Sequence, residues 1–149
     1  MTGAVALRTA SAADLAHIEA LLLSATLPID GLEQHFEQFI VAEAAGAIVA
    51  SAGLELYGHD ALLRSVVVAP RLRRRGLGER LLDEIRRRAQ RQHVQALYLL
   101  TTTSEAYFAA RGFALVQREH VPDAVKRSRA FVELCPASAI AMCCALQAG

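Results

Sequence analysis

The sequence has 149 residues and contains no tryptophan, a single lysine and three cysteines, and aromatic residues make up only 5% of it. The cysteines, Cys135, Cys143 and Cys144, are odd in number and include no C-x-x-C pair. Neither a disulfide framework nor a dithiol motif is therefore indicated. Because reduced thiols are expected, and because Met1 to Leu7 lacks the basic segment that begins a signal peptide, we predict a cytoplasmic protein.

Long uncharged apolar runs are also missing. The longest, from Leu134 to Gly149, is interrupted by Pro136 and falls short of the roughly 18 to 20 apolar residues that a membrane span needs. At the same time 54% of the residues are hydrophobic, which excludes a disordered chain. The length corresponds to about one domain, and we expect a single domain over residues 1–149.

Charge of one sign does not dominate, since 16 Lys and Arg minus 15 Asp and Glu give a formal net charge of +1. One segment is strongly basic, however: residues 71–91 contain nine arginines and three acidic residues, an excess of six positive charges. A nucleic-acid-binding module would use such a segment, but it would also need net basicity and aromatic residues for stacking. We therefore expect no nucleic-acid partner and no membrane partner, and the arginines require another explanation.

Hydrophobic periodicity predicts helices and strands along the whole chain. Helical spacing follows the capping box Ser11 to Asp14 and recurs over 32–39, 76–92 and 103–110. Apolar, β-favouring runs predict strands over 4–9, 39–44, 46–56, 62–69, 96–100, 113–118 and 137–146, with a loop-rich segment between the last two. This order predicts an α/β fold with one mixed, mostly antiparallel sheet of about six to seven strands, flanked by about four helices.

One turn carries more information than the rest of the pattern. The strand over 62–69 is stopped by Pro70, and a loop containing Gly76 and Gly78 then opens the long helix. The first turn of a helix has unpaired N–H groups at a positive dipole end, and glycines let an anion approach those amides closely. Three arginines directly before the helix are unfavourable there unless an anion is bound. The sequence predicts an anion-binding turn, and the alternative is a solvated basic loop.

The motif Arg73-x-x-Gly76-x-Gly78 resembles the acetyl-CoA signature Q/R-x-x-G-x-G/A of the GNAT family of N-acetyltransferases. Its place after the strand ending at Pro70, and the later element Tyr107 to Phe113, resemble that family too, which implies the GNAT fold. Within the family the chain is most similar to bacterial arsenic-resistance N-acetyltransferases, over 32–36, 54–58, 62–66, 98–103 and 134–139. A looser resemblance is to short bacterial N-acetylglutamate synthases.

The resemblance implies direct transfer of an acetyl group from acetyl-CoA to an amine, without a metal. The backbone of Val66 and Val68 would pair with the pantetheine arm. The amide of Val67 or Val68 would polarise the thioester carbonyl, a role typically worth roughly a few kcal/mol. Amides from Arg74 to Glu79 would hold the pyrophosphate. The residues assigned to the cofactor are Val66, Val67, Val68, Arg73, Arg74, Arg75, Gly76, Leu77, Gly78, Glu79, Thr103, Tyr107 and Phe108.

The acceptor amine must lose a proton before it attacks. Many relatives have a glutamate near the start of the fourth strand, where this chain has Leu62 or Leu63, and we assign the base to Glu55 instead. The alternative is that Glu55 pairs with Arg64, because a carboxylate in an apolar strand must be paired or lose its charge.

The family's usual general acid, a tyrosine, is also replaced. Phe108 stands at its position, and Tyr107 is one residue earlier. Adjacent helix residues point about 100° apart, so Tyr107 does not automatically take over the role. We expect the leaving thiolate to take a proton from solvent.

Arg64 is predicted to bind the acceptor, since a guanidinium can hold a carboxylate, phosphonate or arsonate in a bidentate pair. On an extended strand the side chains at 64, 66 and 68 share a face, which would be the substrate face. Thr101, Thr102 and Thr103 offer hydroxyls near it, although threonines also simply favour strands. His35 would line the acceptor pocket, but lone histidines without metal-ligand spacing are more often packing or surface residues.

The predicted function is N-acetylation of a small amino acid, or of an amino-acid-like acceptor with an acidic group that contains arsenic or phosphorus. An N-acetylglutamate-synthase-like enzyme and a non-catalytic acetyl-CoA-binding module are the alternatives. The sequence does not decide whether the protein forms a homodimer. Neighbours on a strand point to opposite faces, so Cys143 and Cys144 are predicted to be buried, inert thiols that do not chelate arsenic.

Overall fold

A computed structural model describes residues 5–129, 131–132 and 138–146. Cys135 and the predicted start of the last strand at 137 lie outside these residues. The chain forms two compact units. The first unit consists of Met1–Leu54 and Ser65–Ile85, and the second of Glu55–Arg64 and Arg86–Gly149. The single-domain assignment of residues 1–149 stays a prediction.

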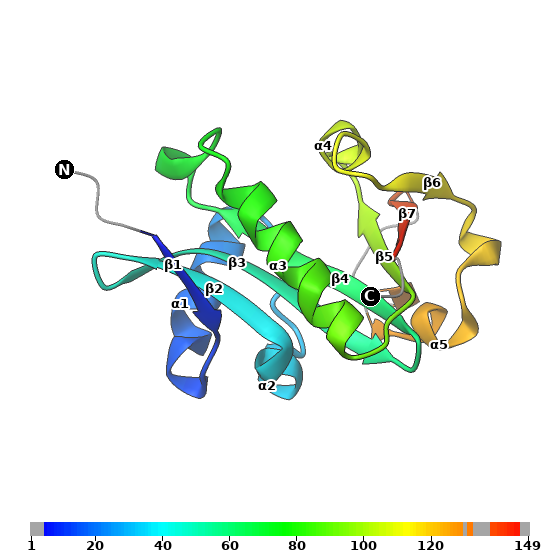
Figure 1. The fold of residues 1–149 in the computed structure, drawn as a ribbon, viewed down its shortest axis with the longest axis horizontal. Coiled ribbons are helices and arrows are strands. Elements are labelled where there is room, and N and C mark those ends of the chain that lie inside the picture. Colours follow the sequence, from blue (N-terminus) through cyan, green and yellow to red (C-terminus); the bar gives the residue numbers. More distant parts are fainter. Residues whose placement is uncertain (1–4, 130, 133–137, 147–149) are drawn as a thin grey trace. The chain divides into compact units, whose positions relative to one another are not determined.

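The elements of the described residues follow the predicted order closely (Figure 1). The strands are β1 Ala6–Thr9, β2 Phe39–Ala44, β3 Ala47–Tyr57, β4 Asp60–Val68, β5 Ala96–Thr101, β6 Ala114–Val116 and β7 Ile140–Ala145. The α-helices are α1 Leu15–Ser24, α2 Leu32–His35, α3 Leu77–Arg91, α4 Glu105–Ala109 and α5 Asp123–Lys126. Short 3₁₀ helices are η1 Ala12–Asp14, η2 Phe36–Gln38, η3 Pro70–Leu72 and η4 Arg118–His120.

The strands form one seven-stranded sheet in the order β1-β2-β3-β4-β5-β7-β6. Pairing is antiparallel between β1 and β2, β2 and β3, β5 and β7, and β6 and β7, whereas β4 and β5 run parallel. The fold is therefore α/β with a mostly antiparallel sheet, as predicted. Helix α5 is an addition, since the sequence indicated only loops between β6 and β7.

In the first unit, β1 and β2 are tied to the start of α1 by charged groups. The predicted capping box is present, with the Ser11 amide donating to Asp14 Oδ2 at 2.8 Å. The Arg8 guanidinium donates to both Asp14 oxygens, at 2.7 and 2.9 Å, and also to Glu43 on β2 at 2.8 Å. The network is possible because η1 returns Asp14 to β1 six residues after Arg8, and it fixes the entry into α1.

The core of the first unit packs helices α1 and α2 against the inner face of its strands. The buried side chains of this cluster include Ile18, Leu22, Leu32, Phe39, Val41 and Val67. Gly53 on β3 is paired with Phe39, and a Cβ at Gly53 would lie 2.3 Å from the Phe39 ring. Glycine is therefore required there by close packing.

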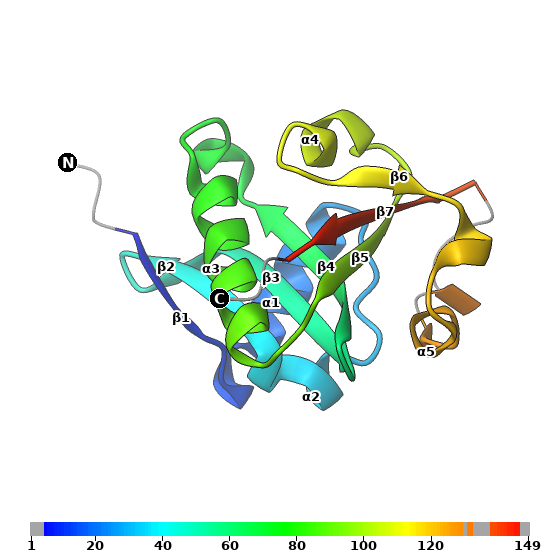
Figure 2. The same cartoon turned by 45° about the vertical axis from the view of Figure 1, so that its right-hand side comes forward.

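In the second unit, β4, β5, β7 and β6 lie side by side in that order (Figure 2). One cluster joins Leu62 of β4 and Ala141 of β7 to Val121 and Val125, which come from the segment between β6 and β7. Tyr57, Tyr98, Leu100, Val116 and Phe131 complete this cluster. The segment predicted as loops is thus anchored by apolar side chains against the sheet.

Strand β4 contains a backbone irregularity that the sequence did not reveal. Ser65 has φ 58°, in the left-handed region that non-glycine residues seldom adopt, and its carbonyl accepts the Ser51 hydroxyl at 2.8 Å. Alternation of side chains between two faces requires every intervening residue to be extended. The predicted common face for Arg64, Val66 and Val68 is therefore wrong, because Ser65 interrupts the extended backbone between the first two.

Candidate functional site

The turn after β4 is built by backbone bonds and two left-handed residues. The Ala69 amide donates to the Val49 carbonyl at 2.7 Å, and η3 begins at Pro70. Arg74 has φ 65° and Gly76 has φ 78°. Nothing lies within 4 Å of a Cβ built on Gly76, so its positive φ, and not crowding, is what requires glycine.

Helix α3 begins directly after this turn, as predicted. At its N-terminus the Arg80 amide donates to the carbonyl of Gly76, the residue just before the helix, at 3.1 Å. The amides of Leu77, Gly78 and Glu79 belong to the first turn of the helix, where backbone amides in general have no intrahelical acceptor. The predicted apolar stripe is buried, with Leu77, Leu81, Leu82, Ile85 and Ala89 all at 4% exposure or less. This burial holds the helix in place, with its N-terminus at the turn.

The arginines before α3 are exposed, and one of them makes a contact that the sequence did not indicate. Arg73 Nε donates to the Val68 carbonyl at 3.0 Å. This carbonyl belongs to the strand backbone assigned to the pantetheine arm. Val67, in contrast, directs its side chain into the core of the first unit and is 5% exposed. Only the backbone of Val67 is therefore available for the catalytic role predicted for it.

A buried ion pair forms in the second unit. Arg64 Nη1 lies 2.8 Å from Glu55 Oε2, and the two side chains are 9% and 5% exposed. The other carboxylate oxygen, Oε1, accepts the hydroxyl of Tyr57 at 2.6 Å. Of the alternatives for Glu55, the structure shows the pairing with Arg64. Both oxygens of the Glu55 carboxylate therefore accept hydrogen bonds, and the opposite charge of Arg64 offsets the cost of burying this carboxylate.

Tyr57 and Ser128 lie beside the Glu55–Arg64 ion pair, and the sequence analysis did not single them out. Burial, and then the hydrogen bond to the Glu55 carboxylate, raises the pKa of Tyr57, and the side chain of Ser128 acts in the opposite direction. Ser128 is 4% exposed and lies just after α5. Tyr57 follows Glu55 by two residues on one strand face, a spacing that predicts the contact. No local signal could have indicated Ser128, which is far away in sequence.

The threonines at and after the end of β5 differ in their roles. Thr101 Oγ1 accepts the amide of Ser104 at 3.0 Å, so this hydroxyl terminates β5 and starts α4. Thr102 and Thr103 are exposed. The predicted acceptor role of Thr101 and Thr102 and the cofactor role of Thr103 stay predictions.

Tyr107 and Phe108 on α4 point in different directions, as expected for helix neighbours. Phe108 is 8% exposed and packs edge-on against Phe113, with ring centroids 5.6 Å apart. The Arg111 guanidinium lies 3.6 Å from the centre of the Tyr107 ring and donates to the Tyr107 carbonyl at 2.8 Å. Tyr107 is therefore a stacking partner of Arg111 and does not occupy the position of Phe108.

The remaining candidates are dispersed. His35 is half-buried at the end of α2 in the first unit. Cys143 and Cys144 are free thiols on β7, paired with Tyr98 and Leu97 of β5, so their side chains lie on opposite faces as predicted. Within the part of the chain that the structure describes, no three His, Cys, Asp or Glu side chains gather as a metal site. Nor, in those residues, is any helix long and apolar enough to cross a membrane.

The assigned residues are distributed over both units. The first unit contains Val66 to Val68, the turn from Arg73 to Glu79, and His35, whereas the second contains the other candidates. The structure brings Glu55 and Arg64 into direct contact and adds Tyr57 and Ser128 to them.

The sheet order, the turn and the helix after β4 define an acetyltransferase-like α/β fold. In agreement, the family model described as "Acetyltransferase (GNAT) family" matches residues 9–115. The chain therefore belongs to the GNAT family of acetyltransferases, which confirms the family predicted from the motif.

Individual relatives are amino-acid acetyltransferases. The chain is 39% identical over 95 residues to the amino-acid acetyltransferase of Pseudomonas fluorescens, covering 62% of this chain and 22% of the relative. It is 32% identical over 94 residues to the enzyme of that name from Pasteurella multocida, again covering 62% of this chain and 21% of the relative. The chain thus spans about a fifth of the length of the curated relatives it matches.

Solved structures show the same fold. A crystal structure of N-acetylglutamate synthase from Neisseria gonorrhoeae, complexed with coenzyme A and L-arginine, is 26% identical and has a TM-score of 0.82. The match covers 96% of this chain and 33% of the Neisseria chain. Ard1 from Thermoplasma volcanium, at 19% identity, matches over 97% of this chain and 99% of its own with a TM-score of 0.75, which shows the fold alone.

Proposed function

We propose that this chain transfers the acetyl group of acetyl-CoA to the amine of a small amino acid. The observation that carries the proposal is the open turn from Arg73 to Gly76 before α3, within the segment matched by the acetyltransferase family. The names of the relatives support an amino acid as acceptor, since two of them are amino-acid acetyltransferases. The coenzyme A in the Neisseria structure supports the cofactor.

The residues of the turn fit a doubly phosphorylated carrier. Arg73, Arg74 and Arg75 are exposed, and a glycine with open space above it precedes a helix of 15 residues. A pyrophosphate would accept hydrogen bonds from the amides between Arg74 and Glu79, where the helix dipole also favours negative charge. No metal is needed, because amides and guanidinium groups supply the positive charge.

Acetyl-CoA supplies an activated acetyl group as a thioester. The Val67 or Val68 amide would donate to the thioester carbonyl as its oxygen gains negative charge, which stabilises the transition state. The backbone of Val66 and Val68 would pair with the pantetheine arm. For the Val68 carbonyl, this pairing requires Arg73 Nε to share or release its hydrogen bond. Arg73 then stands at the junction of the pantetheine and the pyrophosphate positions.

The acceptor would be recognised by its acidic group. Arg64 is a buried cation whose guanidinium carries five N–H donors in a planar fork, of which Nη1 serves Glu55. A carboxylate of the acceptor would bind to the same guanidinium, and Glu55 would receive the proton that the acceptor ammonium loses, directly or through water. His35, Thr101 and Thr102 are proposed as further acceptor contacts, and Thr103, Tyr107 and Phe108 as neighbours of the thiol end.

A finer proposal concerns the acceptor itself. The resemblance over 32–36, 54–58, 62–66, 98–103 and 134–139 supports an arsenic- or phosphorus-containing amino acid, in arsenic resistance. The relatives favour instead an N-acetylglutamate-synthase-like reaction. Both acceptors carry an acidic group and an amine, so both use the same chemistry. A non-catalytic acetyl-CoA-binding module is the third possibility, motivated by Leu62 or Leu63 and by Phe108, which stand where many members of the family have a glutamate and a tyrosine.

Thiol release from acetyl-CoA tests these proposals together. The acceptors are L-glutamate, L-glutamine, L-aspartate and amino acids with phosphorus or arsenic in the side chain. Turnover with an acidic acceptor is expected, and the arsenic proposal requires the arsenic compound to be preferred. Binding of coenzyme A by calorimetry without any thiol release would leave only the non-catalytic module. No heat with coenzyme A would refute the proposed function.

Two further proposals concern where the protein is located and whether it forms a dimer. A cytoplasmic location is proposed from the expected reduced thiols. A homodimer is proposed as well, although β7, the apolar last strand, pairs with β5 on one side and β6 on the other and so offers no free edge to a second chain. Light scattering after size-exclusion chromatography measures the molar mass, and a value near that of one chain, 16.1 kDa, would refute the dimer.

A further inference from the structure

Three side chains of the second unit are joined by hydrogen bonds, from Tyr57 to Glu55 on β3 and from Arg64 on β4 to the same carboxylate. A fourth side chain, Ser128 after α5, is close enough to Tyr57 to lower its pKa against the effect of burial. The Tyr57 hydroxyl lies 2.6 Å from Glu55 Oε1, and Arg64 Nη1 lies 2.8 Å from Glu55 Oε2. Each link joins two different side chains, so displacement of one member is transmitted to the next.

The position of Arg64 depends on how the Glu55 carboxylate is oriented. That carboxylate can rotate about its terminal bond unless both oxygens are held. Arg64 holds Oε2 and Tyr57 holds Oε1, so the two bonds together set the plane of the carboxylate. The raised pKa of Tyr57 keeps its hydroxyl protonated, and it therefore remains a donor to Glu55 under all ordinary conditions.

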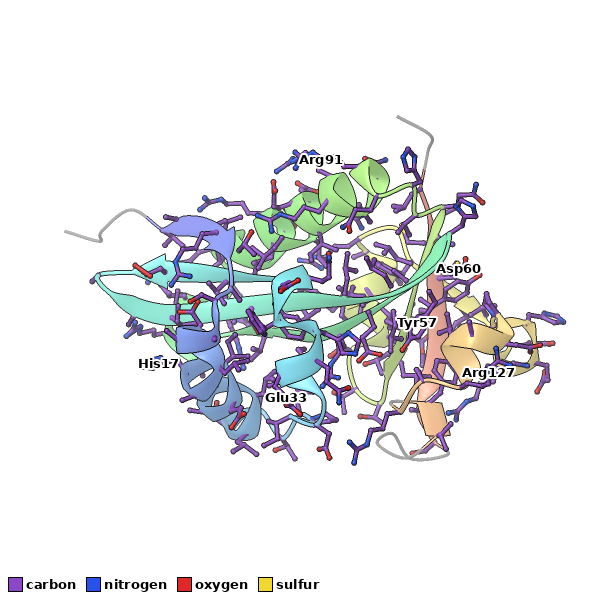
Figure 3. All side chains as sticks on the ribbon, turned by 90° about the horizontal axis from the view of Figure 1, so that it is seen from below. His17, Glu33, Tyr57, Asp60, Arg91 and Arg127 are labelled. Atoms are coloured by element: carbon purple, nitrogen blue, oxygen red, sulfur yellow. The ribbon has the colours of Figure 1, made fainter. Side chains whose placement is uncertain are left out.

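The ring of Tyr57 is itself fixed by packing. It contacts the cluster formed by Leu62, Val121, Val125 and Ala141, and it lies on the side of its strand beside the segment that contains Arg127 (Figure 3). Ser128 in that segment is 4% exposed, and its hydroxyl also accepts the Phe131 amide at 3.4 Å. Packing of the ring against Val121 and Val125 thus fixes where the Tyr57 hydroxyl lies relative to Glu55.

We propose that Tyr57, supported by Ser128, is a positioning residue that sets the orientation of Arg64 through Glu55 and so determines affinity for the acidic group of the acceptor. The inference rests on the proposed function, because it takes Arg64 as the acceptor anchor. Tyr57 contacts neither the acceptor nor the cofactor in this assignment. The segment between β6 and β7 thereby contributes to acceptor specificity through Ser128 without touching the acceptor.

The test compares Tyr57→Phe with Tyr98→Phe. Both tyrosines are half-buried and pack in the same cluster, but Tyr98 is paired with Cys143 of β7, whereas the Tyr57 hydroxyl donates to Glu55. For Tyr57→Phe we expect the KM for L-glutamate to rise about tenfold with the KM for acetyl-CoA unchanged, as for loss of a charge-assisted hydrogen bond. Ser128→Ala is expected to change the acceptor KM in the same direction by a smaller factor. Tyr98→Phe is expected to leave both KM values within about twofold of the parent.

Three outcomes would overturn the inference: an unchanged acceptor KM in Tyr57→Phe, an equal rise in both KM values, or the same effect in Tyr98→Phe. Failure of the proposed function has a different signature, since the parent protein would then release no thiol with any amine. In that case calorimetry of L-glutamate binding to the coenzyme A-loaded protein replaces KM. Weaker binding in Tyr57→Phe alone supports the inference, and equal binding or none in all variants overturns it.

Discussion

Glu55 and Arg64 are nine residues apart in the sequence and form a 2.8 Å ion pair with both side chains more than nine-tenths buried. They face each other because β3 and β4 are neighbouring strands joined by a tight turn at Gly58. Neither charge can be removed alone without leaving the other buried and unpaired. The pair therefore has a structural role in addition to the proposed role in acceptor binding, and the two can be separated by experiment.

Removal of Arg64 alone is expected to destabilise the protein strongly. Arg64→Met leaves the Glu55 carboxylate buried without the Arg64 charge beside it, and breaking a buried pair in this way typically costs about 3–5 kcal/mol. The double substitution Glu55→Leu with Arg64→Met is expected to recover much of that loss, because no charge remains buried. Urea unfolding of the three proteins measures the difference. Equal stability of the single and the double variant would show that the pair is not buried in solution.

Loss of Gly76 is expected to weaken coenzyme A binding by more than its effect on folding. Gly76 and Gly46 both have positive φ, 78° and 80°, and nothing lies within 4 Å of a Cβ on either. Alanine at either position should cost about 1–2 kcal/mol of stability, because the left-handed conformation is strained for alanine. Gly46 lies in the turn between β2 and β3, outside the proposed anion site, and is the matched control.

Calorimetry with coenzyme A therefore distinguishes strain from binding. The dissociation constant is expected to rise about tenfold or more for Gly76→Ala and to stay unchanged for Gly46→Ala. If both variants bind coenzyme A like the parent protein, the turn before α3 does not hold the pyrophosphate.

The network of Arg8 and Asp14 predicts how stability depends on pH. The Arg8 guanidinium holds the pKa of Asp14 well below its ordinary value, against the opposing effect of burial. A carboxyl whose pKa is lowered by folding stabilises the protein above the pKa of the unfolded chain, about 3.9, and loses this contribution as the pH falls below it. The parent protein should therefore lose stability between about pH 4 and pH 2.

Asp14→Asn isolates this effect. The variant is expected to be less stable at pH 7 by about 1–3 kcal/mol, since a charged acceptor of the Arg8 and Ser11 donors becomes neutral. Its stability should change less between pH 5 and pH 2 than that of the parent protein, which urea unfolding at several pH values would show. Parallel stability curves for the two proteins would contradict the role assigned to Asp14.

Gly53 predicts a packing effect that is independent of function. A Cβ at this position would lie 2.3 Å from the ring of Phe39, which is fully buried. Gly53→Ala is therefore expected to cost about 1–3 kcal/mol through overpacking. Adding Phe39→Leu to Gly53→Ala should recover part of the loss, because the smaller side chain makes room for the methyl group. Thermal unfolding measures both, and an unperturbed Gly53→Ala protein would show that the ring does not occupy this space.

The sequence by itself determined the order of the elements apart from α5, the position of the turn before α3, and the family. These depend on local information: the apolar periodicity of α3, the stop at Pro70, the glycine at 76 and the spacing from Arg73 to Gly78 all lie within one short segment. The capping box at Ser11 and the opposite faces of Cys143 and Cys144 are equally local. A chain segment carries such preferences whatever it later packs against.

Only the tertiary structure decided the partners of the buried polar groups. Arg73 was expected near a phosphate and was found on the Val68 carbonyl, and Ser65 was expected to be extended and was found left-handed. Ser128 reached Tyr57 across about seventy residues of sequence, through packing of the segment after β6. Hydrogen-bond partners are set by which surfaces meet when the core closes, and the periodicity of one segment does not contain the position of another.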